Sequence, residues 1–444
     1  MYHRILSMLI LLACTPRCFS DQQELARATK KPWTILIYAA ADNNLRNFAA
    51  YNIKQMATIG SNAGVNILVH LDIRLIGNRK TTRRYYIEKD NVIHVNAADE
   101  HKPPMDSGDP QTLISAAKWA IENYPADHYA LIFWNHGTGI IDPVGGRLLN
   151  MEDLYFYNPE TGTYDLDRTV GFIDLLEMLN DPKGICWDDT TGNYLTNQKL
   201  EFALREICNN YLPGRKLDVI GFDACLMSMI EIAEIIKKFA HYQVGSEEVE
   251  PGKGWNYNLA LAIFDQKIPT ADEVARGIVG AYALAYNKVT RDYTLSALNL
   301  NHIPALENNI NEIARLLLQA ITIDPIVVKT LIRTCKSNAH CVHFDEPSYK
   351  DLYQLYQNLT DQLRSIAQGQ SKVPSSLVQT LQTKLEEGRH IIKNAVIANT
   401  TGPNLAKAQG ISIYFPEKRI HPSYKKTNFA QNNKWSELIM QVLI

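Results

Sequence analysis

The sequence lacks the short motifs that mark several common enzyme classes. It contains no GxSxG nucleophile elbow, which excludes a serine hydrolase of the α/β-hydrolase type. It also contains no HExxH, which excludes the commonest type of zinc peptidase. A dinucleotide-binding GxGxxG is incomplete, because the glycines at 137 and 139 would need a third glycine where Asp142 stands. An acid at that position would meet a pyrophosphate unfavourably.

An excess of one charge sign is also missing. The 444 residues carry 45 Lys and Arg against 47 Asp and Glu, a net charge of −2. Such a chain has no field that would gather nucleic acid or anionic lipid, so we expect neither as a partner. With 46% hydrophobic residues it can bury a large core, and we expect a globular protein.

The N-terminal stretch "MYHRILSMLILLACTPRCFS" lacks an apolar run long enough to cross a bilayer. Its mostly apolar run, 5–13, follows Arg4 and falls well short of the roughly 20 residues that a spanning helix needs. The pattern predicts a signal peptide over 1–20, cleaved after Ser20, and an exported protein. Two alternatives stay open: "LLAC" (11–14) resembles a bacterial lipobox that would attach lipid to Cys14 at the cell envelope, or the segment is never removed.

Cysteine is scarce, and no pair has the CxxC spacing of a metal site. The seven cysteines are Cys14, Cys18, Cys186, Cys208, Cys225, Cys335 and Cys341. Loss of the first two with the signal would leave an odd number, so at least one thiol would have no partner in the chain. Cys335 and Cys341 could form a disulfide if the turn between them brings them close.

Apolar runs typical of buried strands alternate with helical patterns over residues 30–300. The expected strands are Trp33–Ala40, Val65–Ile73, Asp127–Asn135, Leu217–Asp223 and Tyr242–Glu248, and the clearest helix is Pro110–Tyr124. This alternation predicts a three-layer α/β domain with a mostly parallel central sheet flanked by helices. Residues 301–444 read as a mainly helical part, with helices over 301–321, 351–368 and 376–398. A late strand, 410–416, could return to the same sheet.

Two of these strands end in residues that can carry chemistry. "LIFWNHGTG" (131–139) places His136 and two glycines past one strand, and "VIGFDAC" (219–225) places Cys225 past another. The apolar spacing of Leu226, Met229, Ile230, Ala233 and Ile236 predicts a helix directly after the cysteine. A helix N-terminus and a nearby histidine would favour the thiolate, and glycine N–H groups could hold an oxyanion. Either residue alone would more commonly be a packing residue, but together they indicate acyl transfer.

"NHGTG" (135–139) combined with "GFDACLMSMIEIA" (221–233) resembles the clostripain family of cysteine peptidases, within the group that shares the caspase–haemoglobinase fold. The stretches "CWDDTTGNYLTNQKLEFAL" (186–204) and "SEEVEPGKGWNY" (246–257) also resemble that family. The resemblance covers about residues 32–300 and is weaker beyond.

The resemblance implies a role for each motif residue. His136 and Cys225 would form the catalytic dyad, and the backbone N–H groups of Gly137 and Cys225 the oxyanion hole. Asp223 would lie in the pocket that receives the side chain before the scissile bond, where a carboxylate suits Arg or Lys. The alternative for Asp223 is a helix N-cap.

Members of the family often cut themselves between the histidine and the cysteine. In this chain that segment is 137–224, with Arg147, Arg168 and Lys183 as basic candidates, each of which could equally be a solvated surface residue. Calcium dependence also occurs in the family. Asp188 and Asp189 could help to bind such a cation, but a loop turn explains them equally well. We therefore assign no metal ligand and expect no cofactor to be required.

The sequence thus predicts an exported cysteine endopeptidase that cleaves protein or peptide substrates after basic residues through a thioacyl intermediate. The alternative is a catalytically inactive binding protein that keeps the fold at the cell surface. The two differ in whether His136 and Cys225 come together.

Overall fold

The structure is a computed structural model, and it describes residues 29–75, 79–99, 102–142, 154–168, 184–367 and 371–443. The expected signal peptide (1–20) with its lipobox lies outside the described residues, as do Arg147 and Lys183. Among the residues that are described, no helix is both long and apolar enough to cross a membrane.

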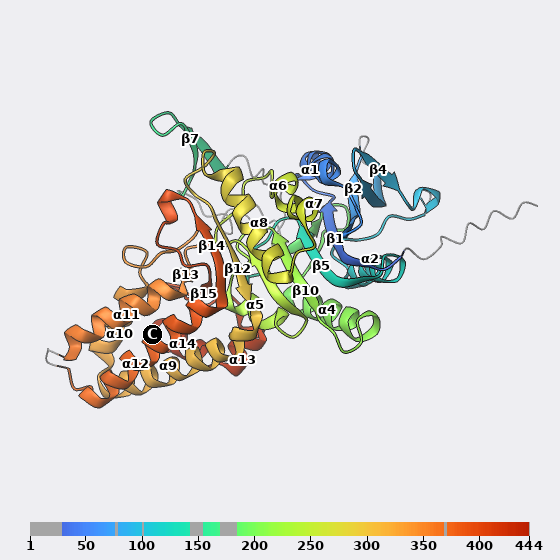
Figure 1. The fold of residues 1–444 in the computed structure, drawn as a ribbon. Helices are drawn as coiled ribbons and strands as arrows, with labels where there is room; N and C mark the ends of the chain where they lie inside the picture. The colour runs from blue at the N-terminus through green and yellow to red at the C-terminus, as the bar shows by residue number, and fades with distance from the viewer. Residues whose placement is uncertain are drawn as a thin grey trace, which may run out of the picture.

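A nine-stranded sheet forms the centre of the molecule (Figure 1). Its five central strands are parallel: β2 (Val65–Arg74), β1 (Lys31–Ala41), β5 (Ala126–Trp134), β10 (Leu217–Asp223) and β11 (Ala240–Gly245). Antiparallel strands extend both edges: β3 (Lys80–Glu88) and β4 (Asn91–His94) beyond β2, β12 (Thr294–Asn299) and β14 (Val396–Thr401) beyond β11. The predicted α/β class with a parallel central sheet is confirmed.

Helices cover both faces of the sheet, which is why the central strands are apolar along nearly their whole length (Figure 1). One layer contains α1 (Arg46–Ile59), α6 (Tyr257–Leu261), α7 (Ile263–Gln266) and α8 (Ala271–Tyr286). The other contains α2 (Pro110–Asn123), α4 (Asn197–Tyr211) and α5 (Ile230–Ile236). Shorter strands form two hairpins outside these layers, β6 (Tyr155–Asn158) with β7 (Thr163–Leu166) and β8 (Ile185–Asp188) with β9 (Asn193–Leu195).

The C-terminal part packs as a group of helices at one end of the sheet (Figure 1). They are α9 (Ile303–Ile323), α10 (Pro325–Lys336), α11 (Leu352–Ala367), α12 (Ser375–Ala395), α13 (Asn428–Asn432) and α14 (Trp435–Leu443). Their buried apolar residues belong to the same continuous core as those of the sheet.

The expected return of the late strand to the central sheet is wrong. β15 (Ser412–Tyr414) pairs instead with β13 (Tyr349–Asp351) in a separate two-stranded sheet. The free edge of β12 is filled by β14, which starts directly after α12 and takes residues that the sequence pattern assigned to a helix. The C-terminal part thereby supplies one strand of the central sheet.

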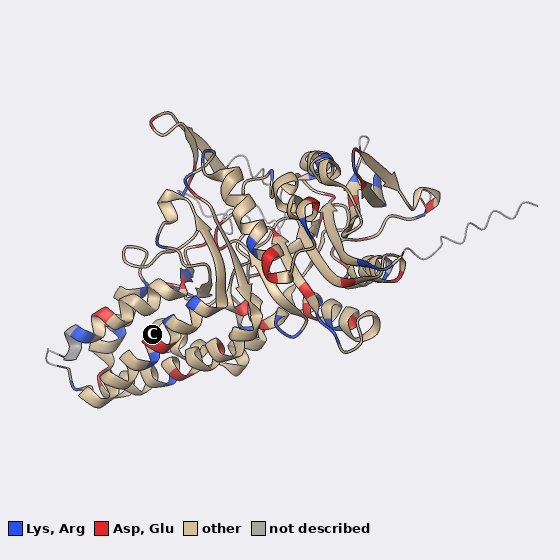
Figure 2. Cartoon of the chain, viewed as in Figure 1, with Lys and Arg blue, Asp and Glu red and all other residues tan. Residues whose placement is uncertain are grey.

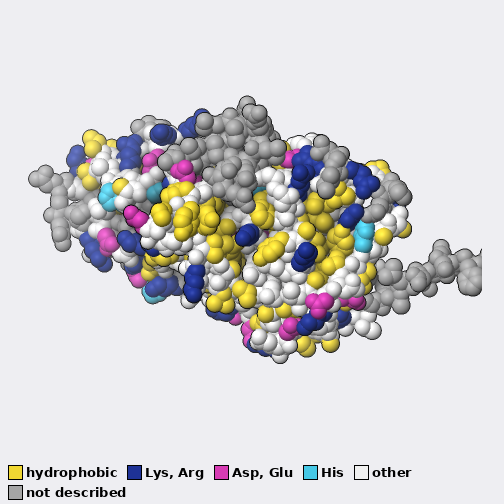
Figure 3. Space-filling view, turned by 90° about the horizontal axis from the view of Figure 1, so that it is seen from above, with side chains coloured by type: hydrophobic (Ala, Val, Ile, Leu, Met, Phe, Trp, Pro, Cys, Tyr) yellow, Lys and Arg dark blue, Asp and Glu magenta, His cyan; other side chains and the backbone are white. Residues whose placement is uncertain are grey.

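Acidic and basic residues are interspersed along the outer helices and loops (Figure 2). Seen from above, Lys and Arg side chains stand singly or in small groups between apolar and uncharged ones (Figure 3). This pattern agrees with the nearly balanced charge of the sequence.

Candidate active site

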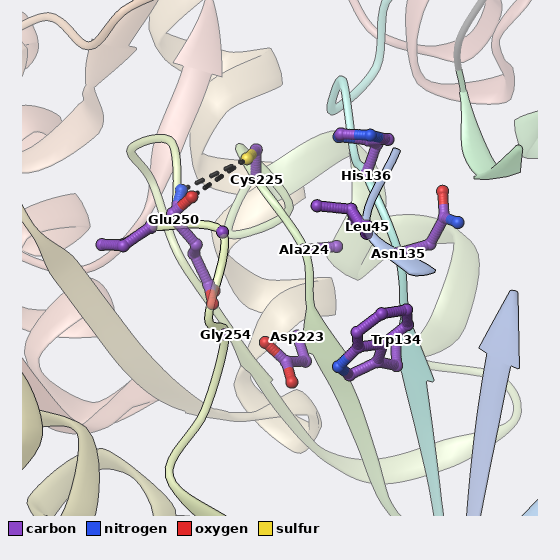
Figure 4. Close-up of a pocket in the computed structure, with 11 residues that line it drawn as sticks. Leu45, Trp134, Asn135, His136, Asp223, Ala224, Cys225, Glu250 and Gly254 are labelled. Atoms are coloured by element: carbon purple, nitrogen blue, oxygen red, sulfur yellow. Dashed lines mark hydrogen bonds between the residues drawn. The ribbon is translucent and has the colours of Figure 1, made fainter. Parts of the chain in front are cut away.

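The two strands that end in His136 and Cys225 are neighbours in the sheet. Trp134, the last residue of β5, pairs with Asp223, the last residue of β10, so the loops that follow leave the sheet side by side. His136 and Cys225 line one pocket, and the close-up shows both side chains among the residues that surround it (Figure 4). The structure therefore places the two residues in the same pocket. The pocket is lined by Leu45, Trp134, Asn135, His136, Asp223, Ala224, Cys225, Glu250, Pro251, Gly252 and Gly254.

The glycines of "NHGTG" allow the histidine loop to pack directly on the cysteine loop. A Cβ on Gly137 would lie 2.4 Å from the Cys225 carbonyl oxygen, and one on Gly139 would lie 2.8 Å from the Leu226 carbonyl oxygen. Gly139 also has a φ of 64°, which a side chain would oppose. The glycines are thus needed for the contact between the loops, and this contact places the backbone of Gly137 beside Cys225.

The predicted helix directly after Cys225 is wrong. α5 begins at Ile230, and Cys225 lies in a turn in which Leu226 adopts a φ of 62°. The helix dipole therefore does not act on this thiol. The N-cap alternative for Asp223 is wrong for the same reason, because the N-cap of α5 is Met229.

What holds the cysteine is the segment directly after β11, residues 246–250, which we call the strap. Its backbone carbonyls accept hydrogen bonds from the turn around the cysteine: Ser246 from the N–H of Ser228 at 2.8 Å, and Glu248 from the N–H of Leu226 at 3.1 Å. The N–H of Glu250 donates to the Cys225 Sγ at 3.2 Å (Figure 4). The predicted strand over 242–248 therefore ends early, at Gly245, because the strap pairs with the cysteine turn rather than with β10.

Burial raises the pKa of the Cys225 thiol well above its ordinary value, and the hydrogen bond from Glu250 only partly offsets this. Burial acts in this direction because the charged thiolate loses its hydration. The cysteine therefore rests as a thiol, contrary to the expected thiolate, and its proton must be removed when it attacks.

The side chains of the strap connect the cysteine turn to distant parts of the chain. Glu247 accepts a hydrogen bond from the Gly410 N–H at 2.9 Å, and Glu248 accepts one from the Asp345 N–H at 2.8 Å. Glu248 also pairs with Arg168 at 2.8 Å, which reaches Asp292 at 3.1 Å as well. These carboxylates raise the pKa of Arg168 further, against its burial. The C-terminal part thus helps to fix the strap.

Asp223 lines the same pocket and is 4% exposed. Its carboxylate accepts hydrogen bonds from the Trp255 N–H at 3.0 Å and from the Tyr257 hydroxyl at 2.8 Å. Burial nevertheless raises its pKa to about 7. Glu250 lines the same pocket, and burial together with the charge of Asp223 raises its pKa well above the ordinary range. Two carboxyl groups that resist ionisation therefore face the space beside the cysteine.

A buried amide, that of Asn52, helps to fix the wall of this pocket. Asn52 on α1 accepts a hydrogen bond from the Trp134 indole N–H at 3.0 Å. Its own amide donates to the carbonyls of Lys253 and Trp255 at 3.2 and 3.3 Å. The loop that carries Gly254 is held against Asp223 in this way, so closely that a Cβ on Gly254 would lie 2.5 Å from the Asp223 Oδ1.

The expected calcium candidates do not fit a cation site. Asp188 pairs with the Lys80 ammonium, which also lies 3.0 Å from Asp72, and Asp189 pairs with Arg74 at 2.8 Å. Protein cations already occupy both carboxylates. In the described ranges, no group of His, Cys, Asp and Glu side chains could hold a metal ion. Calcium dependence stays a prediction with no ligand set among these residues.

Among the described residues, the four cysteines outside the pocket form no disulfide. Cys186, Cys208, Cys335 and Cys341 are buried and free. The expected disulfide between Cys335 and Cys341 is absent from the structure, and burial raises the pKa of the Cys335 thiol to about 12.

Sequence reasoning missed Glu250, Leu45 and Asn44, the last of which contacts His136. Asn44 follows the predicted first strand, whose end lies at the same edge of the sheet as the ends of β5 and β10. The rule that functional residues gather at the carboxyl ends of parallel strands could have drawn attention to it.

Known proteins share both the sequence pattern and the fold. The model of the clostripain family matches residues 37–144 and 174–441. Clostripain from Hathewaya histolytica is 27% identical over 256 residues, a match that covers 52% of this chain and only 41% of clostripain.

Two solved structures show the same fold over nearly the whole chain. A secreted C11 cysteine protease from Bacteroides thetaiotaomicron, solved with an irreversible peptide inhibitor, has a TM-score of 0.57 at 20% identity, over 92% of this chain and 99% of its own. An inactive zymogen C11 protease from Parabacteroides distasonis has a TM-score of 0.58 at 18% identity, over 91% and 98%. Because the family model matches well over half of the sequence, the chain belongs to the clostripain family of cysteine peptidases.

Proposed function

We propose that this protein is an exported endopeptidase that cleaves after Arg or Lys, with Cys225 as nucleophile and His136 as its acid–base partner. One observation carries the proposal: Cys225 and His136 line a single pocket that also contains the buried carboxyl group of Asp223. Export rests on the N-terminal pattern of the sequence, and the similar protein from Bacteroides thetaiotaomicron is described as secreted.

The chemistry follows from a cysteine that rests as a thiol. When the Cys225 Sγ attacks the substrate carbonyl carbon, His136 takes the thiol proton and the carbonyl oxygen becomes an oxyanion. The backbone N–H groups of Gly137 and Cys225 are proposed to stabilise that oxyanion. His136 then gives the proton to the leaving amine as the C–N bond breaks, which leaves a thioester on Cys225. Water releases the acyl group, with His136 accepting a proton from the water and returning one to the sulfur.

The preference for basic residues is proposed to arise from Asp223 with Glu250 beside it. A buried carboxylate is best satisfied by a desolvated cation, and an arginine side chain offers five N–H donors. Because burial raises the pKa of both carboxyl groups, binding of a cation would favour their charged forms and release a proton.

Self-processing between residues 137 and 224 is part of the proposal, but Arg168 is a poor candidate for the cleavage point. Its guanidinium group is engaged with Glu248 and Asp292, so a peptidase pocket could reach it only after both ion pairs break. We therefore place the cut elsewhere in the segment, where Arg147 and Lys183 are the remaining candidates.

The test is hydrolysis of matched fluorogenic peptides ending in Arg, Lys or Leu by the purified chain from residue 21. The intact and the trypsin-nicked protein are compared, each with added calcium and with a chelator, beside Cys225→Ala. We expect cleavage after Arg and Lys, little after Leu, and none by Cys225→Ala. Calcium dependence would appear as loss of cleavage in the chelator. No cleavage in any condition would instead favour the inactive binding protein.

A further inference from the structure

We propose that Asn44 is a positioning residue that fixes the tautomer and the orientation of His136. The inference rests on the proposed function, because it concerns the same histidine. The Asn44 Oδ1 lies 2.7 Å from the His136 Nε2, the distance of a strong hydrogen bond. Asn44 belongs to the turn between β1 and α1 and is far from His136 in the sequence. The strands that precede the two residues, β1 and β5, are neighbours in the sheet.

The identity of the partner atom determines which ring nitrogen carries the proton. An amide oxygen can only accept, so a neutral His136 places its hydrogen on Nε2. Its Nδ1 then presents a lone pair and becomes the nitrogen that exchanges a proton with the thiol and the leaving amine. A ring without this partner would divide between two tautomers, and only one of them could accept the proton.

Asn44 is itself held in a rigid turn. The neighbouring Asn43 is buried, and its side-chain amide donates to the carbonyls of Ala40 at 2.9 Å and Trp187 at 3.0 Å. Its side-chain oxygen accepts from the Leu45 N–H at 2.9 Å. The residues on both sides of Asn44 are therefore fixed, and little conformational entropy remains to be lost when its amide meets the histidine.

The histidine loop is fixed to the same two carbonyl groups. Asn135, directly before His136, donates from its side chain to the Ala40 carbonyl and, at 3.5 Å, to the Trp187 carbonyl. It also accepts from the Trp187 N–H at 3.0 Å. Because Asn43 and Asn135 share these acceptors, the loops that carry Asn44 and His136 are coupled as one unit. Coupled loops hold the histidine ring in one orientation, and proton transfer depends on such precise placement of the catalytic group.

An amide suits this site better than a carboxylate. A carboxylate in the same place would stabilise the charged imidazolium, whereas His136 must be neutral to take the proton of a cysteine that rests as a thiol. The other titratable groups that line the pocket with His136 are Cys225, Asp223 and Glu250. They are unchanged in the variants proposed below, so a shift in the pH profile would report on the histidine.

The experiment compares kcat and KM of the wild type with those of Asn44→Ala, Asn44→Asp and Asn47→Ala on the Arg peptide, from about pH 5 to about pH 9. Asn47 is an exposed neighbour on α1 and serves as the matched control. We expect Asn44→Ala to lower kcat about 10- to 100-fold with KM nearly unchanged, the cost of a misplaced catalytic group. Asn44→Asp keeps an acceptor of the same shape, so it should recover most of kcat while moving the acid limb upward by about one pH unit. Asn47→Ala should match the wild type.

Wild-type kcat in Asn44→Ala at every pH would overturn the inference. So would a loss expressed in KM alone, or an equal loss in the Ala and Asp variants with no shift of the pH profile. If Asn44→Ala fails to fold, the isosteric Asn44→Asp still decides through its pH profile. Failure of the proposed function would show separately, as a wild type that does not cleave or that cleaves without Cys225.

Discussion

Replacing Asp223 by Asn should make the protein more stable, increasingly so as the pH rises, while it weakens cleavage after basic residues. In the folded protein the Asp223 pKa is about 7, against an ordinary value of 3.8. Between these values the unfolded chain ionises this carboxyl group and the folded chain does not, so the wild type loses stability as the pH rises. At about 1.36 kcal/mol for each pH unit, the loss reaches roughly 4 kcal/mol above pH 7.

Asparagine keeps the shape of the neutral acid and avoids this loss. Its side-chain oxygen can still accept from the Trp255 N–H, and the Tyr257 hydroxyl can rotate to accept from the new amide. Removing the charge of Asp223 would also lower the pKa of Glu250, because that charge helps to raise it. The gain in the free energy of unfolding should therefore be roughly 2 kcal/mol near pH 5 and roughly 4 kcal/mol near pH 8.

The assay is urea unfolding at both pH values, in a Cys225→Ala background that prevents self-digestion. Asp265→Asn, an exposed change of the same charge on α7, is the matched control and should show no comparable gain. In the protein that retains Cys225, Asp223→Asn should lower kcat/KM for the Arg peptide at least roughly 30-fold, which corresponds to about 2 kcal/mol of lost binding energy. The kcat/KM for the Leu peptide should not change. A variant equally stable or less stable than its parent at pH 8 would refute the reasoning.

Two further predictions concern packing around the site. Gly137→Ala places a Cβ 2.4 Å from the Cys225 carbonyl oxygen and should lower kcat about 100-fold. The control is Gly280→Ala in α8, where a Cβ meets nothing within 4 Å, and this variant should retain activity. Steady-state kinetics compares the two variants, and an equal loss of kcat in both would contradict the geometry. Lys80→Met leaves Asp72 and Asp188 without their buried cation. It should lower the free energy of unfolding, measured by urea titration near pH 7, by about 3 to 5 kcal/mol. An unchanged free energy of unfolding would mean that these residues do not form a stabilising ion-pair cluster.

The strands that carry the site could be predicted because their signals are local. The run Leu217–Asp223 is apolar, short and followed by a turn, and β10 has the predicted bounds. The carboxyl ends of parallel strands lie at one edge, so the sequence could place His136 and Cys225 at the same edge of the sheet. It left open whether the two residues approach each other, because that depends on β5 and β10 being neighbours.

The turn that contains Cys225 could not be predicted from the sequence in this way. The residues after it repeat with helical spacing, yet the chain first forms a turn because the strap supplies backbone hydrogen bonds from residues distant in the sequence. Val396 and Ile397 likewise fit a helical period, but the open edge of β12 makes them a strand. Asn44 gave little signal, since Asn is common in turns whatever its function. In each case a tertiary partner decided between two locally acceptable structures.

The most direct test of the account is to find which residue reacts with an irreversible peptide electrophile that ends in Arg. After incubation of the full chain from residue 21 with this reagent and with a matched Leu reagent, mass spectrometry of the digested protein locates the adduct. The account predicts one adduct, on Cys225, formed by the Arg reagent, slowed strongly in His136→Ala, and scarce with the Leu reagent. Labelling of another cysteine, or equal labelling of Cys225 by both reagents in the wild type and in Asp223→Asn, would contradict it.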